Sequence, residues 1–246
     1  MLRACARRIA TPVAEVNSLV LPSLSNSSKE VSLFSTRTKE PFQTTPQPLN
    51  FEHPVDSPHP WVENSTLGRF ALSILGYYSR STRLQQGALR LYSAIQSQAE
   101  NVFLQQQLSL PPKFATIHSL LCLHVWLVLG RLRPEGKDGK DLSQEMYDLF
   151  QEDVEKRVRK EGVKVRVGKW LSDLETTFYG GAQAYDKALK GEGNFAEALM
   201  RNVYGKEGSM RDAKRLERYL RREIACLAMT DSEAVLGGQI RFTIDF

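Results

Sequence analysis

The chain has 246 residues, of which 41% are hydrophobic and 25% are charged, and its formal net charge is +5. This composition is that of an ordinary globular domain, and it excludes collagen-like, low-complexity and disulfide-rich classes. A chain of this length buries roughly 70% of its unfolded surface, so it needs no disulfide or structural metal to fold. The small basic excess does not by itself indicate a nucleic-acid partner.

The amino-terminal segment, residues 1–36, has the composition of a mitochondrial transit peptide. Three arginines lie within its first eight residues, no acidic residue precedes Glu15, and serine is frequent afterwards. An arginine-rich, serine-rich and acid-poor start is typical of such leaders. We therefore predict a mitochondrial protein with a disordered targeting segment that is processed near residues 33–36.

Residues 37–60 are predicted to form a linker. Proline has no backbone N–H and a fixed φ, so a dense group of prolines disfavours helices and central strands. The prolines of this segment are Pro41, Pro46, Pro48, Pro54, Pro58 and Pro60.

From residue 61 to 230 apolar residues recur with the period of an α-helix, which predicts one compact all-α domain. The expected helices cover about 64–78, 84–108, 112–132, 142–161, 163–189, 195–204 and 209–229. The helix at 112–132 is apolar on nearly every face, so we expect it to be the central one. Gly180–Gly181 is expected to interrupt the fifth helix. The tail, 231–246, fits an added strand or a loose end.

The most apolar run, Ser119–Leu129, is too short for a bilayer span, which needs about 20 apolar residues, and it contains His124. No transmembrane helix is therefore predicted, and any membrane contact is expected to be peripheral.

Local signatures of catalysis or of a cofactor site are absent from the sequence. It has no DDxxD, no GxGxxG, no Walker A motif, no GxSxG elbow and no Glu-x-x-His pair. The three cysteines lie far apart, which argues against a zinc module and a disulfide framework. His118 and Cys122 lie one helical turn apart but lack a second ligand pair, so we interpret them as core residues. We expect no catalytic residue, cofactor or metal.

Basic residues gather in two clusters. The first cluster comprises Lys156, Arg157, Arg159, Lys160, Lys164, Arg166 and Lys169. The second is expected to line the outward face of the last helix and comprises Arg211, Arg215, Arg218 and Arg222. Such faces suit RNA phosphates or anionic lipid headgroups, although a solvated helix surface has the same pattern.

Several segments of the predicted domain stand in an order that resembles the ubiquinol–cytochrome c chaperone family. They are Leu123–Leu127 with Arg131–Leu132, Tyr147–Phe150 with Asp153, Gly162–Val163 with Val167–Lys169, and Phe178–Gly181 with Tyr185–Leu189. The resemblance covers about residues 65–205. It implies a non-enzymatic assembly chaperone for mitochondrial respiratory complex III.

The resemblance also implies partners and a location. The client would be nascent cytochrome b, with a small partner assembly subunit and the mitochondrial ribosome nearby, in the matrix and peripheral to the inner membrane. A chaperone for apolar helices needs an exposed apolar or aromatic groove. The candidate contact residues for such a groove are Trp126, Trp170, Tyr179 and Tyr185.

Two further functions remain open on the sequence. A ribosome- or RNA-binding translation factor would use the two basic clusters for phosphate contacts. A helical enzyme of quinone or isoprenoid lipids would need a closed apolar pocket with converging carboxylates.

Overall fold

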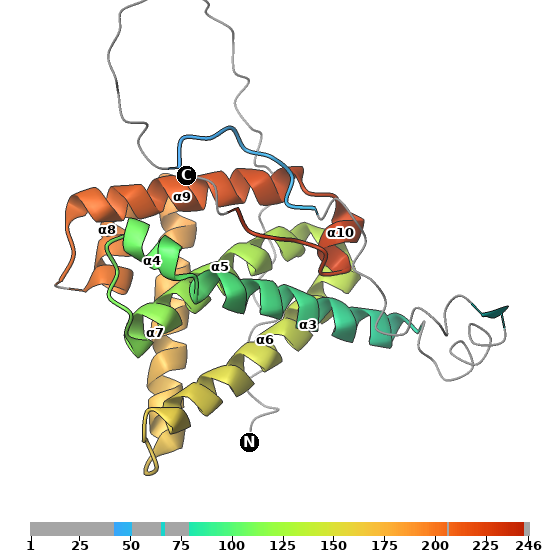
Figure 1. Ribbon diagram of the computed structural model, residues 1–246, viewed down its shortest axis with the longest axis horizontal. Coiled ribbons are helices and arrows are strands. Elements are labelled where there is room, and N and C mark those ends of the chain that lie inside the picture. Colours follow the sequence, from blue (N-terminus) through green and yellow to red (C-terminus); the bar gives the residue numbers. More distant parts are fainter. Residues whose placement is uncertain (1–41, 51–64, 67–78, 206, 244–246) are drawn as a thin grey trace, which may run out of the picture. The chain divides into compact units, whose positions relative to one another are not determined.

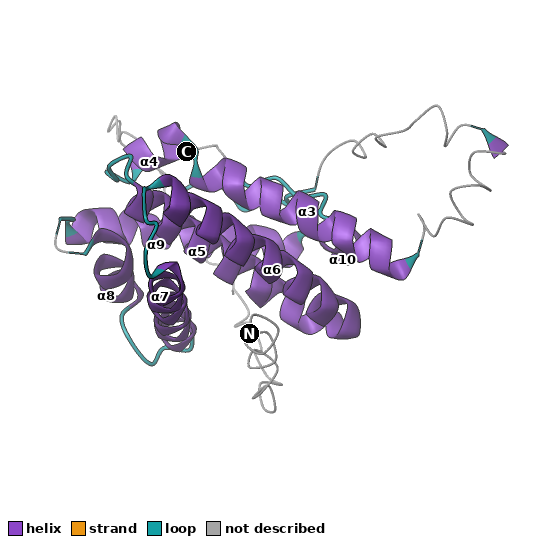
Figure 2. Cartoon of the chain, turned by 90° about the horizontal axis from the view of Figure 1, so that it is seen from below, coloured by secondary structure: helices purple, strands orange, loops and turns teal. Residues whose placement is uncertain are grey.

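The structure, a computed structural model, describes residues 42–50, 65–66, 79–205 and 207–243. In this part of the chain the fold is all-α, as predicted (Figures 1 and 2). The helices are α3 (Arg80–Ala99), α4 (Val102–Gln107), α5 (Phe114–Leu132), the 3₁₀ turn η3 (Arg133–Glu135), α6 (Gly136–Lys160), α7 (Val167–Leu189), α8 (Phe195–Leu199), the π-helical turn η4 (Met200–Tyr204), α9 (Met210–Met229) and α10 (Ser232–Leu236). The predicted leader lies outside the described residues, and so does nearly all of the helix expected at 64–78.

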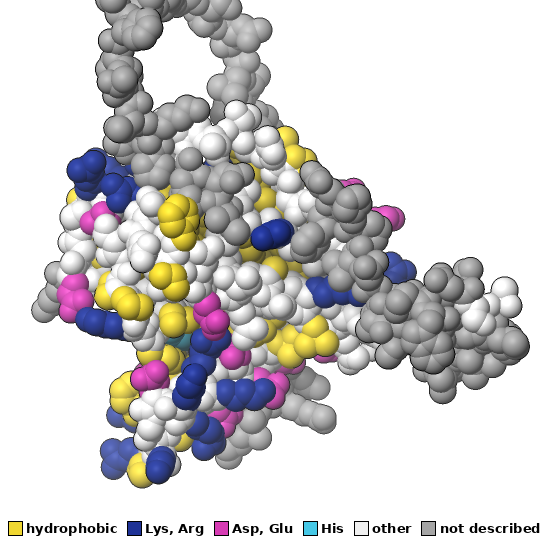
Figure 3. Space-filling model, viewed as in Figure 1, with side chains coloured by type: hydrophobic (Ala, Val, Ile, Leu, Met, Phe, Trp, Pro, Cys, Tyr) yellow, Lys and Arg dark blue, Asp and Glu magenta, His cyan; other side chains and the backbone are white. Residues whose placement is uncertain are grey.

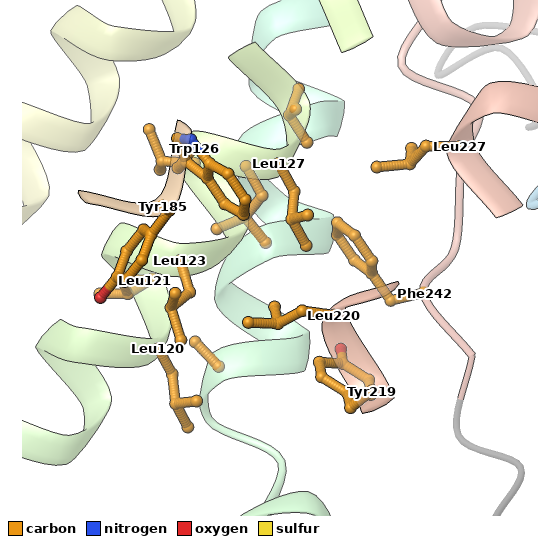
Figure 4. Packing of buried hydrophobic residues seen from close by; sticks show 14 of the residues in the cluster. Leu120, Leu121, Leu123, Trp126, Leu127, Tyr185, Tyr219, Leu220, Leu227 and Phe242 are labelled. Carbon is orange, nitrogen blue, oxygen red and sulfur yellow. The ribbon is translucent and has the colours of Figure 1, made fainter. Parts of the chain in front are cut away.

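Helix α5 is the central helix, which confirms the prediction from its apolar character. It packs against α3, α6, α7 and α9, and its leucines interdigitate with side chains from α9 and the tail (Figure 4). In the described part of the chain, Phe114–Lys160 is one helical stretch that could span a bilayer by length and composition. Its apolar window is 61% buried inside the fold, so it serves as core.

One predicted loop is helical in the structure. Residues 134–139 read as a loop from their proline and glycine content, yet α6 begins at Gly136. Arg80 of α3 donates hydrogen bonds of 2.7 Å to both Asp138 and Asp141 and holds the first turns of α6. Gly139 is required there, because a Cβ atom would lie 2.2 Å from the carbonyl oxygen of Leu132.

A buried chain of hydrogen bonds joins α3, α5 and α9. The Nδ1 atom of His124 lies 2.7 Å from the carbonyl oxygen of Leu120, which only accepts, so Nδ1 carries the proton. Nε2 then accepts from the Tyr219 hydroxyl at 2.7 Å, and this hydroxyl accepts from Gln98 at 3.0 Å. Gln98 also donates to the carbonyl oxygen of Thr243 at 3.1 Å. Each side chain in this series of hydrogen bonds has a partner, which offsets the cost of burying it.

Residues 42–50, within the predicted linker, are packed against α9. In Figure 1 this segment (blue) runs along α9 toward α10. Phe42 and Leu49 are only 4% and 3% exposed. The Phe42 ring lies 5.2 Å from that of Tyr219, and the Leu49 amide donates to Thr230 Oγ1 at 3.0 Å. We call this segment the strap, and it forms part of the core.

The tail is also packed onto the fold. Val235, Ile240 and Phe242 are buried, and the Phe242 ring lies 4.9 Å from the ring of His124. Ile240 forms an isolated antiparallel bridge with Asn50 of the strap. The tail is therefore a short helix followed by an extended segment that pairs with the strap.

A second buried imidazole lies near the other end of α5. His118 stacks between Phe114 and Phe150, with ring centroids 5.9 and 6.3 Å away. Its Nε2 lies 3.5 Å from Cys122 Sγ, whereas its Nδ1 has no hydrogen-bond partner among the described residues. Burial lowers the pKa of His118 to about 4, and the nearby charge of Arg157 acts in the same direction.

The strap makes a testable contribution to stability. We expect Phe42→Ala to lower the free energy of unfolding by about 3 kcal/mol, because it leaves a cavity against Tyr219. Urea denaturation measures the change. Gln43→Ala, at an exposed neighbouring position, is the control and should change nothing. Equal stability of the two variants would contradict the assignment of the strap to the core.

The buried histidines predict an acid-sensitive fold. The pKa values of His118 and His124 fall from 6.5 to about 4 on folding, so the unfolded chain binds more protons in this range. The stability contributed by their neutral forms is full above pH 6.5 and is lost as the pH falls toward 4. His118→Phe keeps the ring stack and removes one titrating group. Between pH 7 and pH 5, the free energy of unfolding of His118→Phe should fall by about 2 kcal/mol less than that of the native chain. Equal losses in urea unfolding would disprove this.

Candidate interaction surface

The four candidate aromatic residues divide into two pairs. Trp126 and Tyr185 are 4% and 5% exposed, and their rings lie 5.2 Å apart in the core (Figure 4). The indole N–H of Trp126 donates to Asp186 at 2.8 Å, so this pair fastens α7 to α5. Trp170 and Tyr179 are 53% and 38% exposed on α7. The structure therefore corrects the expected set, since only Trp170 and Tyr179 lie on a surface.

The second half of helix α7 packs against the core, whereas its first half projects from the fold. It runs across α5 and α9 rather than along them (Figures 1 and 2). Its buried residues, Phe178, Gly181, Tyr185 and Ala188, all belong to its second half. Its first half and the end of α6 converge on the loop 161–166, away from α3 and α9 (Figure 1). We call the two helices and their loop the α6–α7 hairpin.

The expected interruption at Gly180–Gly181 is wrong, since α7 is continuous from Val167 to Leu189. Packing of the flanking aromatic side chains stabilises the helix beyond what glycine costs. A Cβ atom at Gly181 would make ordinary contacts with Tyr185, whereas one at Gly180 would meet nothing within 4 Å. Gly180 therefore leaves helix backbone open on the outer face, beside Tyr179.

An aromatic cluster fixes this outer face. The Phe178 ring lies 5.7 Å from Tyr147, 5.6 Å from Phe150 and 5.4 Å from Tyr179. Burial and a hydrogen bond with Tyr179 raise the pKa of Tyr147, so its phenol stays protonated. Tyr179 is therefore held by α6 while more than a third of its side chain remains exposed.

The part of the first basic cluster that lies on α6 is neutralised by acidic neighbours. Arg157 donates to Asp153 at 2.6 Å and to Glu100 of α3 at 2.5 Å. Lys156 and Arg159 pair with the glutamates one turn before them. These three residues therefore support the hairpin rather than form a free cationic face.

The remaining part of this cluster lies around the loop. Its exposed members have no carboxylate partner in the part of the chain that the structure describes, and they are Lys160, Lys164, Arg166 and Lys169. Figure 3 shows basic side chains gathered at this end of the molecule. The structure thus concentrates the positive potential at the end of the hairpin.

The second basic cluster is not one outward face. Arg222 is 5% exposed, pairs with Glu223, donates to Thr44 at 2.9 Å and lies over the Phe42 ring. The spacing of the arginines does place Arg222 in line with the others, but the strap covers that end of α9. Because residues 37–60 are predicted to be a linker, the sequence gives no sign that they cover Arg222.

The other members of the second cluster lie near the start of α9. Arg215 donates to the carbonyl oxygen of Gln107 at 2.9 Å. Arg211, Lys214 and Arg218 line a shallow surface depression with Met210. Arg211 and Lys214 are exposed there.

Among the described residues, no group of three or more His, Cys, Asp or Glu could hold a metal ion. A cavity of about 30 Å³ lies between α5 and α7, beside His118, Cys122, Gly181 and Asn202. This volume suits one water molecule. Burial raises the pKa of Cys122 to about 12, which keeps it a neutral thiol.

Comparison with known proteins identifies the family of this chain. The profile of the family described as "Ubiquinol-cytochrome C chaperone" matches residues 106–242. The crystal structure of the Cbp3 homolog from Brucella abortus superposes with a TM-score of 0.61 at 29% identity. It covers 69% of this chain and 96% of that one.

Curated relatives are named ubiquinol-cytochrome c reductase complex assembly factor 1. The mouse protein is 30% identical over 168 residues, which are 65% of this chain, and the human protein is 29% identical over 198 residues, which are 75%. The chain spans 56% and 64% of the length of these two relatives. The family profile covers more than half of the chain, from the end of α4 through the hairpin to the tail. The chain therefore belongs to the ubiquinol–cytochrome c chaperone family.

Proposed function

We propose that this chain is a non-enzymatic assembly chaperone for mitochondrial respiratory complex III. The observation that carries this proposal is the family match over residues 106–242, which contains the whole α6–α7 hairpin. The assembly-factor names of the mouse and human relatives support it. Its exposed aromatic side chains suit the binding of another polypeptide.

The client that we propose is newly made cytochrome b, and the contact is the outer face of α7. A glycine in an exposed helix interior costs about 1 kcal/mol relative to alanine. No packing within the described chain accounts for Gly180, but the absence of its side chain lets another helix approach closely. Tyr179, the residue before it, adds exposed aromatic surface. An apolar client helix would bury the Tyr179 ring.

The expected partners and location belong to the same proposal. A small partner subunit and the mitochondrial ribosome would meet the chaperone in the matrix, where newly made cytochrome b enters the inner membrane. The cationic loop of the hairpin and the exposed Arg211 and Lys214 offer two regions for contacts with anionic partners.

Neither alternative function fits as well. An RNA-binding function would use both basic clusters, but one arginine of each cluster, Arg157 or Arg222, is bound to carboxylates of this chain. An enzyme of quinone or isoprenoid lipids needs a pocket of some hundreds of Å³. The cavity between α5 and α7 is about 30 Å³, and the larger depression on α9 is open and is lined by Met210 and three basic residues without a carboxylate.

Removal of the chain from cells should deplete assembled complex III and spare the other respiratory complexes. Native gel electrophoresis of mitochondrial membranes measures both. Re-expression of the native chain is the control and should restore complex III. Normal complex III levels without the chain would overturn the proposed function.

Crosslinking should locate the client on α7. A photoreactive amino acid at position 180 has open space around it, so the fold should tolerate it. We expect it to crosslink newly translated cytochrome b in mitochondria. The same amino acid in place of Leu89, which is 55% exposed on α3, is the matched control and should give a yield several-fold lower. Equal yields at the two positions would remove α7 as the contact.

A further inference from the structure

We propose that the end of the α6–α7 hairpin, residues 160–170, is a peripheral anchor for an anionic lipid bilayer. We call these residues the hairpin tip. This inference concerns the tip alone and does not rest on the identity of the client. It follows from an exposed apolar pair, a group of cations and a defined loop conformation in one place.

The apolar pair is Val165 and Trp170. Val165 is 75% exposed, which is the highest value among the large hydrophobic side chains of the described residues, and Trp170 is 53% exposed. Their neighbours Val163 and Val167 pack against the core. The tip therefore has both a buried apolar side that attaches it and an exposed apolar side that lacks a partner within the described chain.

The loop that carries Val165 has a defined backbone. Gly162 and Arg166 both have positive φ, of 90° and 56°. The amides of Gly162 and Val163 bond to carbonyl oxygens of Arg159 and Val158 at 3.1 and 3.3 Å, so the end of α6 closes in an ordered turn. Positive φ is unfavourable for arginine, and the carbonyl oxygen of Arg166 accepts hydrogen bonds from the amides of Lys169 and Trp170 at 3.0 and 3.2 Å, which start α7. The exposure of Val165 is thus a feature of an ordered turn.

Positive charge surrounds this pair. Within residues 160–170 there are four basic residues and one acidic residue, Glu161. None of the four bases has a carboxylate partner in the described part of the chain. Figure 3 shows basic and hydrophobic side chains close together at the end of the molecule farthest from α9. Lysine and arginine beside a tryptophan and an aliphatic side chain are typical of proteins that lie in a membrane interface.

Val165 distinguishes lipid from nucleic acid. An RNA contact gains from phosphate neutralisation and from bases stacked on aromatic rings, and an aliphatic side chain contributes to neither. A bilayer interface accepts both Val165 and Trp170 while its anionic headgroups neutralise the surrounding cations. The observations therefore favour a lipid surface.

Vesicle binding by the full chain tests the proposal. Flotation with phosphatidylcholine vesicles containing about one-third phosphatidylglycerol should recover the protein, and phosphatidylcholine alone should recover much less. Lys164→Glu with Arg166→Glu should lower the partition coefficient by about 10-fold or more. Val165→Asp should lower it several-fold, although it leaves all four bases in place. Trp170 emission should shift to the blue on binding, and Trp170→Phe should abolish this shift.

The matched control is Leu89→Asp with Arg83→Glu, which changes one exposed apolar and one exposed basic residue on α3. It should bind as the native chain does. The leader is present in every variant, so its own affinity for lipid cancels in the comparison, and thermal unfolding verifies that each variant folds.

Unchanged vesicle binding of Val165→Asp would overturn the proposal, and so would an equal loss in the α3 control. Release of the protein from vesicles by RNA, with no effect of Val165→Asp, would assign the tip to nucleic acid instead. Complex III levels after deletion test the proposed function separately, so the two can fail independently.

Discussion

The buried ion pair between Arg222 and Glu223 is the constraint on which the closed end of this fold depends. Arg222 is 5% exposed and Glu223 is fully buried, and both bond to Thr243 of the tail. Burial raises the pKa of Glu223, whereas Thr243 and Arg222 lower it. A buried charge left without its partner is strongly destabilising. The strap and tail bury this pair when they close over α9, and the hydroxyls of Thr44 and Thr243 supply hydrogen bonds that offset the cost.

This closed end contrasts with the hairpin. Around α9, hydrogen bonds link the strap, the tail and three helices, and the buried Tyr219 lies at their centre. In the first half of α7 no residue is fully buried. Regions with few buried contacts open at the lowest free energy. The described part of the fold thus combines a densely packed support around α9 with a first half of α7 that has few buried contacts.

The sequence predicts helices and burial correctly where they follow from the local pattern of apolar residues. It does not predict them where contacts with residues far away in the chain decide the structure. The apolar periodicity of α5 predicted both its helix and its central position. The start of α6 was missed because Arg80, far away in the chain, holds Asp138 and Asp141. Arg222 was misplaced because the strap covers it. Trp126 lies on the apolar helix α5, which favours its burial, whereas the exposure of Trp170 depends on how α7 crosses α5.

The geometry of α7 relates the two proposed contacts. Trp170 and Gly180 are ten residues apart on one straight helix, so about 15 Å separates them along the axis. If the hairpin tip lies in the headgroup layer, the open backbone at Gly180 lies within a few helical turns of the bilayer. A client segment that has not yet inserted, or has just left the lipid, would meet this face without crossing a wide aqueous gap. A membrane contact at the hairpin tip would therefore place the proposed client-binding face of α7 close to the bilayer surface.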